Sequence, residues 1–208
     1  MPTTPPTHRP LLAALALACA LAAPPAWGQA AENEAAAPEP DAALAAFLAE
    51  HPHGSAEMAR LAPLVGDWKI VTRAKQQDGS YVDGTARWRF WYVLDGKVLM
   101  DEWRAPKPDG SGEGVGVNLR HYDASAGHYV ALWLDDSLDD WRPYTARFEG
   151  ERFVMRGMSV APSGAEGDAR ITFYGIEPDS FRWKLDWSVD GGETWIPEVF
   201  LIEATRAR

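Results

Sequence analysis

Three charged residues lie inside otherwise apolar segments of this sequence: Glu102, Arg120 and Asp135. A charge in a protein interior is costly unless it is paired, so these side chains would need one another or a ligand if they face inward. The two carboxylates could act as general acid and base while the guanidinium holds an anionic intermediate. Alternatively, the cluster could anchor the polar group of an otherwise apolar ligand. A shift of one residue in strand register would instead turn each side chain into solvent.

The tryptophans are the second group of residues that could form a functional site. The chain contains 10 tryptophans, and all except Trp27 follow residue 30. Most of them are expected to fill a core, because a tryptophan side chain buries a large area. Trp88, Trp133 and Trp183 are the candidates for the wall of a ligand pocket.

The histidines do not form a convincing metal site. His51 and His53 are close in sequence but lack a third ligand, which zinc requires. His121 and His128 flank an expected turn, where a zinc site with Asp123 is the alternative to two surface histidines. The sequence therefore predicts no metal site and no cofactor.

Residues 1–30 have the pattern of an export signal. A short basic start precedes an apolar run over 11–23, and Gly28 and Ala30 supply the small side chains that a signal peptidase requires. We predict cleavage after Ala30, a periplasmic or secreted location, and no membrane-spanning segment in what remains. The only cysteine, Cys19, would leave with the signal, and a lipid anchor on Cys19 is the alternative.

The composition is acidic, with 30 Asp and Glu against 20 Lys and Arg and a formal net charge of −10. The basic residues do not cluster. Nucleic acids and anionic membranes are therefore not expected partners, because binding to phosphate groups requires positive charge. A small-molecule ligand is compatible with this composition, and no pattern in the sequence predicts an oligomeric state.

The rest of the chain divides into a leader and one β domain. Residues 31–62 begin with a stretch rich in Ala, Glu and Pro, expected to be disordered, and continue with short helices that Asp41 and Ser55 would cap. From residue 66 onwards, segments rich in aromatic and β-branched residues alternate with turn signals, mostly Asp-Gly pairs. The expected strands span 67–74, 84–94, 97–104, 114–122, 127–135, 142–149, 151–159, 168–176, 180–188 and 194–204.

The connections between these strands determine the expected fold. Because they are short, consecutive strands should pair as antiparallel hairpins, and no long helical pattern separates them as a parallel α/β sheet would need. Ten meandering strands leave two edges exposed unless the sheet closes. We predict an all-β fold over 63–208: a single antiparallel barrel of about ten strands, preceded by one or two short helices. Side chains just fill a barrel of about eight strands, so about ten can leave an internal cavity.

Gly66-Asp67-Trp68, at the start of the first expected strand, is similar to the Gly-x-Trp opening of calycin-type barrels, the lipocalin and nitrobindin-like superfamily. A longer series of motifs resembles a bacterial family of secreted proteins with a calycin-like barrel, whose activity is not established. The series consists of Val93-Leu94-Asp95-Gly96, Asp101-Glu102, Leu119-Arg120-His121-Tyr122-Asp123, Trp133-Leu134-Asp135 and Asp190-Gly191-Gly192-Glu193-Thr194-Trp195. The resemblance covers about residues 60–206 and implies a fold rather than a function.

This resemblance also implies structural roles at one end of the barrel. In lipocalin-like barrels the tryptophan of the opening motif closes that end, and a basic residue of the last strand packs over it. It implies a contact between Trp68 and Arg206 beside Gly66. It implies no haem site, because nitrobindin-like haem binders carry a late histidine and none follows His128 here.

Residues 188–195 match one copy of the Asp-box, Ser-x-Asp-x-Gly-x-Thr-Trp, which recurs in sialidase propellers. A single copy in a chain of this length does not build a propeller. Asp190 and Trp195 are therefore predicted to be structural residues that hold a tight turn between two strands.

The leading functional hypothesis is a binding barrel for a small, largely apolar ligand, with Glu102, Arg120 and Asp135 as its polar anchor. An enzyme that uses the same interior carboxylates is the first alternative. An envelope module that binds glycan or protein through a tryptophan-rich rim is the second. The absence of catalytic signatures favours binding over catalysis.

Overall fold

The computed structural model describes residues 40–107, 109–138, 141–160 and 166–208. The predicted signal peptide over 1–30, with Cys19 and the cleavage position at Ala30, lies outside these residues, as does the expected leader up to residue 39. Within the described chain, no helix is both long and apolar enough to cross a bilayer.

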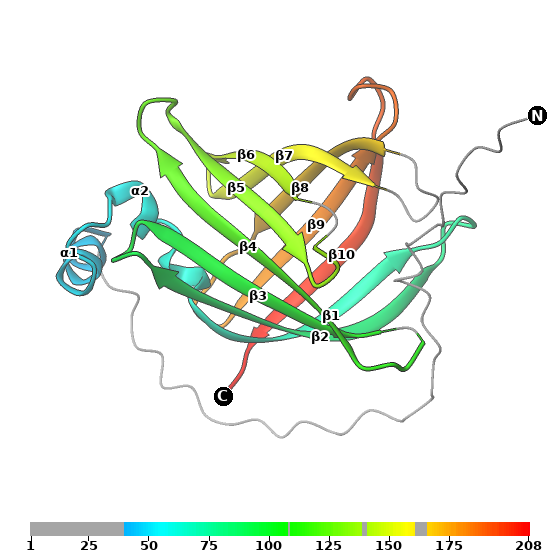
Figure 1. The fold of residues 1–208 in the computed structure, drawn as a ribbon, viewed down its shortest axis with the longest axis horizontal. Coiled ribbons are helices and arrows are strands. Elements are labelled where there is room, and N and C mark those ends of the chain that lie inside the picture. The colour runs from blue at the N-terminus through cyan, green and yellow to red at the C-terminus, as the bar shows by residue number, and fades with distance from the viewer. Residues whose placement is uncertain (1–39, 108, 139–140, 161–165) are drawn as a thin grey trace, which may run out of the picture.

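Ten antiparallel strands form a closed barrel, in which each strand pairs with the next and the last strand pairs with the first (Figure 1). The strands are β1 (Gly66–Lys75), β2 (Tyr81–Val93), β3 (Val98–Pro106), β4 (Glu113–Asp123), β5 (His128–Asp135), β6 (Arg142–Glu149), β7 (Arg152–Val160), β8 (Glu166–Tyr174), β9 (Ser180–Ser188) and β10 (Ile196–Arg206). The described chain begins with short helical segments: α1 (Pro40–Glu50), α2 (Ala56–Ala59) and η1 (Ala62–Leu64). The predicted all-β meander with short helices before it is confirmed.

Strand β2 shows how the sequence specifies the barrel wall. Trp88 and Phe90 are buried, whereas Arg87 and Arg89 are exposed, so alternate residues face the core and the solvent. Inside the barrel, Trp88 contacts Phe90 and Phe173, with ring centroids 4.8 and 5.7 Å apart. The aromatic residues of opposite walls therefore meet in one core.

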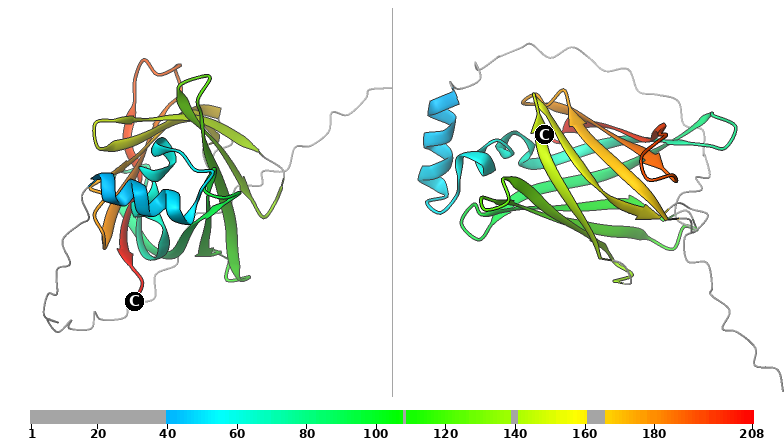
Figure 2. Two further views of the ribbon diagram at one scale, coloured as in Figure 1. Left: turned by 90° about the vertical axis from the view of Figure 1, so that its left-hand side faces the viewer. Right: turned by 90° about the horizontal axis from the view of Figure 1, so that it is seen from above.

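The helical segments cover one end of the barrel, which we call the closed end (Figure 2, left). Ser55 caps α2, as predicted, by accepting a hydrogen bond from the backbone N–H of Met58. The hydroxyls of Tyr92 and Tyr129 donate to the backbone carbonyls of Met58 and Glu57, which ties α2 to β2 and β5. Because Met58 is fully buried, this end is packed with side chains.

Trp68 is part of the same closed end. Its indole N–H donates to the carbonyl of Leu64 at 2.8 Å, and the Arg206 guanidinium carbon lies 4.2 Å from its ring centroid. Gly66 has φ +130, and a Cβ there would collide with the Arg206 guanidinium, so only glycine fits. This is the contact between the first and last strands that the resemblance implied.

The opposite end of the barrel holds the last residues of β1, β3, β5, β7 and β9 and the first residues of β2, β4, β6, β8 and β10, because consecutive strands alternate in direction (Figure 2, right). Figure 2 shows α1, α2 and η1 at the other end, so the described helices do not cover it. We call this the open end.

The Asp-box residues form the turn between β9 and β10. Asp190 accepts hydrogen bonds from the side chain and backbone of Thr194 and from the hydroxyl of Ser188. The indole of Trp195 lies under the guanidinium of Arg170, whose Cζ is 4.4 Å from the ring centroid. Arg170 in turn binds the buried carboxylate of Asp186 at 2.9 Å. The hairpin is thus held against the outer wall of the barrel by its own side chains.

We expect Asp190 in this turn to make the stability of the fold depend on pH. The hydrogen bonds from Thr194 and Ser188 lower the pKa of Asp190 to about 2, below the value of about 3.9 expected in the unfolded chain. A lowered pKa in the folded state stabilises above pH ~4, and this contribution is lost as the pH falls towards 2. Asp190→Asn should therefore lower the Tm at neutral pH, with a difference from the wild type that shrinks between about pH 4 and 2 in circular-dichroism melts. A difference that stays constant with pH would contradict this role.

Candidate functional site

An ion pair lies in the middle of the barrel interior. Asp101 of β3 and Arg120 of β4 are 0 % and 1 % exposed, and the guanidinium Nη1 of Arg120 donates to the carboxylate Oδ2 of Asp101. The other carboxylate oxygen accepts a hydrogen bond from the indole N–H of Trp88 at 2.6 Å. The neighbours of the guanidinium carbon are apolar, with the ring centroids of Phe90 and Phe173 at 5.8 and 5.5 Å. These contacts fix both charges in a defined geometry.

Burial determines the electrostatics of this pair. It raises the pKa of Asp101, while the charge of Arg120 and the hydrogen bond from Trp88 act in the opposite direction. Only the attraction to Arg120 depends on the pair: without this partner the carboxylate would stay buried and its charge would be uncompensated.

Next to the ion pair, hydrogen-bonding capacity remains unused. Among the described residues, the buried side-chain atoms without a partner are Asn118 Oδ1, Arg120 Nε and Trp187 Nε1. Two of these three atoms belong to β4 and to the same face, since Asn118 and Arg120 are two residues apart and both are buried. Buried polar atoms in proteins are almost always satisfied by protein groups, ordered water or a ligand, so these atoms are positions where a ligand or a water can bind.

Between the ion pair and the open end, the inward face of the wall is apolar but not fully buried. Six inward-facing side chains pack against the core and remain half-buried, and we call them the mouth ring. They are Trp103, Trp133, Ile171, Trp183, Leu185 and Phe200. Solvent reaches an inward-facing side chain of a closed barrel only through an end, and the closed end is packed. The mouth ring is therefore accessible from the open end.

One glycine shapes this ring. Gly116 of β4 lies opposite Asp135 and next to Trp133, whose ring would overlap any Cβ at this position. The absence of a side chain lets the indole of Trp133 lie against β4, one step from Asn118, which is the register partner of Trp133. We call Trp88, Asp101, Asn118 and Arg120 the base. Along β4, the base and the mouth ring follow one another directly.

The predicted polar anchor differs from the observed one. Glu102 faces outward: it is about one third exposed, binds Arg104 on the outer wall at 2.6 Å, and has a pKa lowered by that contact. The prediction that Glu102 lies in the interior is wrong by one residue, because the inward carboxylate is Asp101. Asp135 lies at the end of β5, where its Oδ1 accepts hydrogen bonds from the backbone and hydroxyl of Ser137. Of the three predicted charges, only Arg120 belongs to the interior pair.

The three predicted tryptophans all face inward. Trp88 lies at the ion pair, and Trp133 and Trp183 lie in the mouth ring. Asp101, Asn118 and Trp103 also face the interior but were not among the predicted site residues. The period-two pattern of β3 held a signal for two of them. Asp101 and Trp103 share one face of the strand with the apolar residue Leu99, which is fully buried. Glu102 shares the other face of the strand with the apolar residues Val98 and Met100, so the pattern fitted Glu102 equally well.

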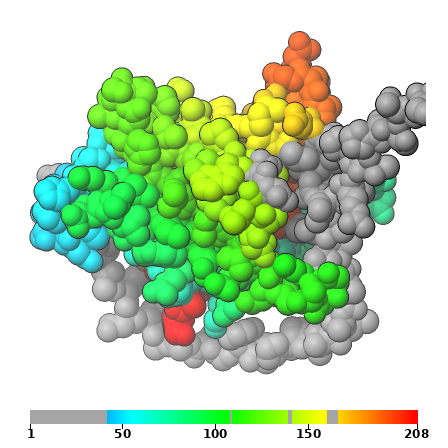
Figure 3. Space-filling view, viewed as in Figure 1, coloured from blue at the N-terminus to red at the C-terminus, as the bar shows by residue number. Residues whose placement is uncertain are grey.

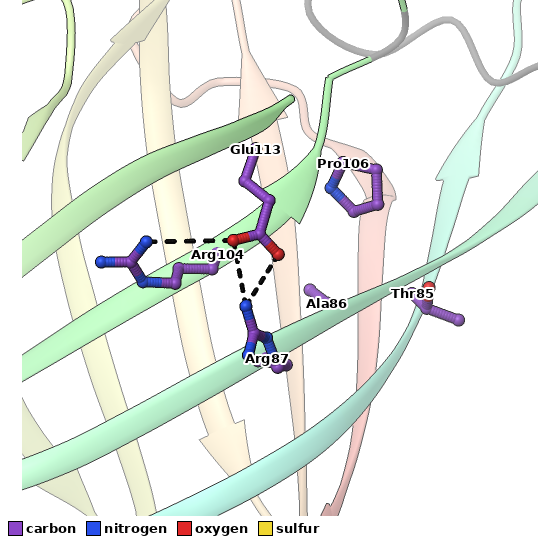
Figure 4. A pocket seen from close by; sticks show the side chains of 6 residues that line it. All are labelled: Thr85, Ala86, Arg87, Arg104, Pro106 and Glu113. Carbon is purple, nitrogen blue, oxygen red and sulfur yellow. Dashed lines mark hydrogen bonds and ion pairs between the residues drawn. The ribbon is translucent and has the colours of Figure 1, made fainter. Parts of the chain in front are cut away.

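A depression of about 160 Å³ lies on the barrel wall at β2 and β3, towards the open end (Figure 4). Glu113 binds Arg87 at 2.8 Å and Arg104 at 3.8 Å there, and Arg104 also binds Glu102. The charges of this depression are paired with one another and partly exposed to solvent, so it offers neither an unmatched charge nor an apolar enclosure. Elsewhere in the described chain, no group of three or more His, Cys, Asp or Glu side chains is placed to hold a metal ion.

A closed meander of ten antiparallel strands with a helix-covered end fits the calycin-like fold that the sequence resemblance implied. Among solved structures, the chain is similar to Rv2717c from M. tuberculosis, with a TM-score of 0.53 and 14% identity, covering 74% of this chain and 99% of that one. It is also similar to the S-type phycobiliprotein lyase CPES from Guillardia theta, with a TM-score of 0.48 and 12% identity over 71% of this chain and 90% of that one. At these identities the likeness concerns the fold alone. No protein-family model and no curated protein matches the sequence.

Proposed function

We propose that this protein is an exported binding barrel that takes a small, largely apolar ligand through its open end. The ligand lies against the mouth ring, and its polar end faces the base formed by Trp88, Asp101, Asn118 and Arg120. One observation carries the proposal: inward-facing apolar side chains remain accessible directly above buried polar atoms that lack partners. Ligand sites in proteins have this composition, an apolar wall with a few convergent polar groups.

The interior geometry favours binding over the acid–base alternative. A general acid and a general base must reach the same substrate. Glu102 lies on the outer wall and Asp135 caps a turn at the rim, so these two carboxylates do not face one another. Asp101 is the interior carboxylate, and it is engaged by Arg120 and Trp88.

The exported location rests on the sequence pattern of residues 1–30. N-terminal sequencing of the protein from the periplasm or medium should begin at Ala31. An uncut chain that stays in the cytoplasm would remove the exported part of the proposal and leave the binding part intact.

A fluorescence titration tests the binding proposal. Diphenylhexatriene, an apolar probe without hydrogen-bonding groups, should bind the wild type saturably at one molecule per chain. Trp183→Leu should weaken this binding about three- to tenfold, because it removes aromatic surface from the mouth ring. Trp91→Leu is the matched control: Trp91 lies on the outer wall, where Arg89 stacks on it, and its replacement should leave the affinity unchanged. Equal losses in the two variants, or no saturable binding at all, would contradict the proposal.

A further inference from the structure

The ion pair at the base of the site has no surplus charge. Asp101 and Arg120 neutralise each other, and both are removed from solvent. Asp135 and Arg142 are the charged residues next to Gly116 and Trp133 in the strand register, at the rim. Asp135 is engaged by Ser137, and Arg142 also has a partner, so neither is free. A carboxylate or an ammonium group brought to the base would meet no free opposite charge, and it would lose its hydration.

The base does have unused hydrogen-bonding capacity of both kinds. Asn118 Oδ1 is an acceptor without a donor, and Arg120 Nε is a donor without an acceptor. The two side chains leave the same face of β4 two residues apart, which separates their backbones by about 7 Å. A group that both donates and accepts a hydrogen bond matches these two atoms in kind.

Asn118 is the part of the base that faces the open end. It is 8 % exposed, whereas Asp101 and Arg120 are 0 % and 1 % exposed. Its register partner on β5 is Trp133 of the mouth ring, and the neighbouring Gly116 leaves the space for that indole. A ligand that packs on the mouth ring reaches Asn118 before it reaches the ion pair.

From this geometry we propose that the polar end of the ligand is an uncharged group that both donates and accepts a hydrogen bond, such as a primary carboxamide or an alcohol, and that Asn118 recognises it. This inference rests on the proposed binding function and specifies the head group for the same site. Asp101 and Arg120 form a fixed pair with no net charge. The ligand satisfies the unpaired hydrogen-bonding atoms of the base without adding a charge.

A series of ligands with one chain length tests the head group. Octanamide, octanol, octanoate and octylamine share the same alkyl chain, and each is used at neutral pH to displace diphenylhexatriene from the wild type. Octanamide and octanol should bind about tenfold more tightly than octanoate and octylamine, because only the neutral groups bind without losing a charge's hydration. Octanoate or octylamine binding as tightly as octanamide would overturn the inference.

Variants of Asn118 separate recognition by this residue from general apolar binding. Asn118→Leu keeps the approximate volume and removes the acceptor, so octanamide affinity should fall about tenfold while diphenylhexatriene affinity stays the same. Asn118→Ala serves the same purpose if the leucine variant does not fold. Glu102→Gln on the outer wall is the control, and it should change neither affinity.

The outcomes distinguish the two proposals. If octanamide affinity is unchanged in both Asn118 variants, a buried water satisfies the orphaned atoms and the head-group inference is wrong. If diphenylhexatriene binds but none of the octyl compounds displaces it, the inference is also wrong, and the apolar site stands. If diphenylhexatriene itself does not bind the wild type, the proposed function fails.

Discussion

Replacing Arg120 with leucine is expected to lower the free energy of unfolding by about 3–5 kcal/mol, measured by urea denaturation at neutral pH. The variant leaves the carboxylate of Asp101 buried, without its cation and among aromatic rings. The loss should become smaller as the pH falls towards 4, because protonation of Asp101 removes the uncompensated charge. The raised pKa of Asp101 makes this protonation easier in the folded state.

Two further variants make this prediction specific. Arg104→Leu breaks the ion pair with Glu102, whose side chains are about one third exposed, and it should cost less than about 1 kcal/mol. The double variant Asp101→Leu with Arg120→Leu removes both interior charges and should recover much of the stability lost in Arg120→Leu alone. A small effect of Arg120→Leu, similar to that of Arg104→Leu, would show that the interior pair is not desolvated as described.

Replacing Trp68 with alanine is expected to cost about 3–5 kcal/mol of unfolding free energy, because it removes a large buried side chain at the closed end. The variant also removes the ring under Arg206 and the hydrogen bond to Leu64 that holds the helical segments to β1. Urea denaturation measures the loss.

Trp91→Ala is the matched control for Trp68→Ala. Trp91 lies on the outer face of the neighbouring strand β2, between Phe90 and Tyr92, and it is only half-buried. Its replacement should cost distinctly less than that of Trp68. Equal costs would contradict the assignment of Trp68 as the residue that closes this end of the barrel.

The fold was predictable because its signals are local. Period-two alternation, as in Arg87–Phe90, and turn residues between short segments were enough to place the strands to within about three residues. Closure followed from the need to pair the two edge strands. The last strand was placed two residues too early, since it begins at Ile196 after the Asp-box turn, and a bulge follows between Ile196 and Phe200. A bulge inserts a residue without a change in composition, so the pattern does not reveal it.

The interior site was predictable only in part, because it depends on which face of a strand is buried. In β3 both faces carry apolar residues: Leu99 and Trp103 on one, Val98 and Met100 on the other. Alternation therefore did not decide between Asp101 and Glu102. Long-range contacts decide it, since Trp88 on the neighbouring strand donates to Asp101.

The local sequence pattern also did not predict the hydrogen bonds that join α2 to the barrel at the closed end. The hydrogen bonds from Tyr92 and Tyr129 to the carbonyls of α2 join segments more than 30 residues apart. Nothing in either segment alone indicates its partner. The packing of α2 over the barrel end, and with it the assignment of the opposite end as the open one, needed the three-dimensional structure.

The space-filling view shows the side chains of β3, β4 and β5 packed side by side on this face of the barrel (Figure 3). In the proposed function a ligand enters through the open end rather than through the side. Ala105 of β3 faces inward at the mouth, whereas Val71 of β1 faces outward and is 48% exposed. A tryptophan at position 105 would fill the mouth of the barrel, whereas a tryptophan at position 71 would add a side chain to the outer wall.

The most direct measurement is the affinity of diphenylhexatriene for Ala105→Trp, Val71→Trp and the wild type, with the Tm of each as the check on folding. With the ligand site inside the open end, Ala105→Trp should lose saturable binding while its Tm stays close to that of the wild type, and Val71→Trp should bind like the wild type. Undiminished binding in a folded Ala105→Trp variant would contradict a site inside the open end.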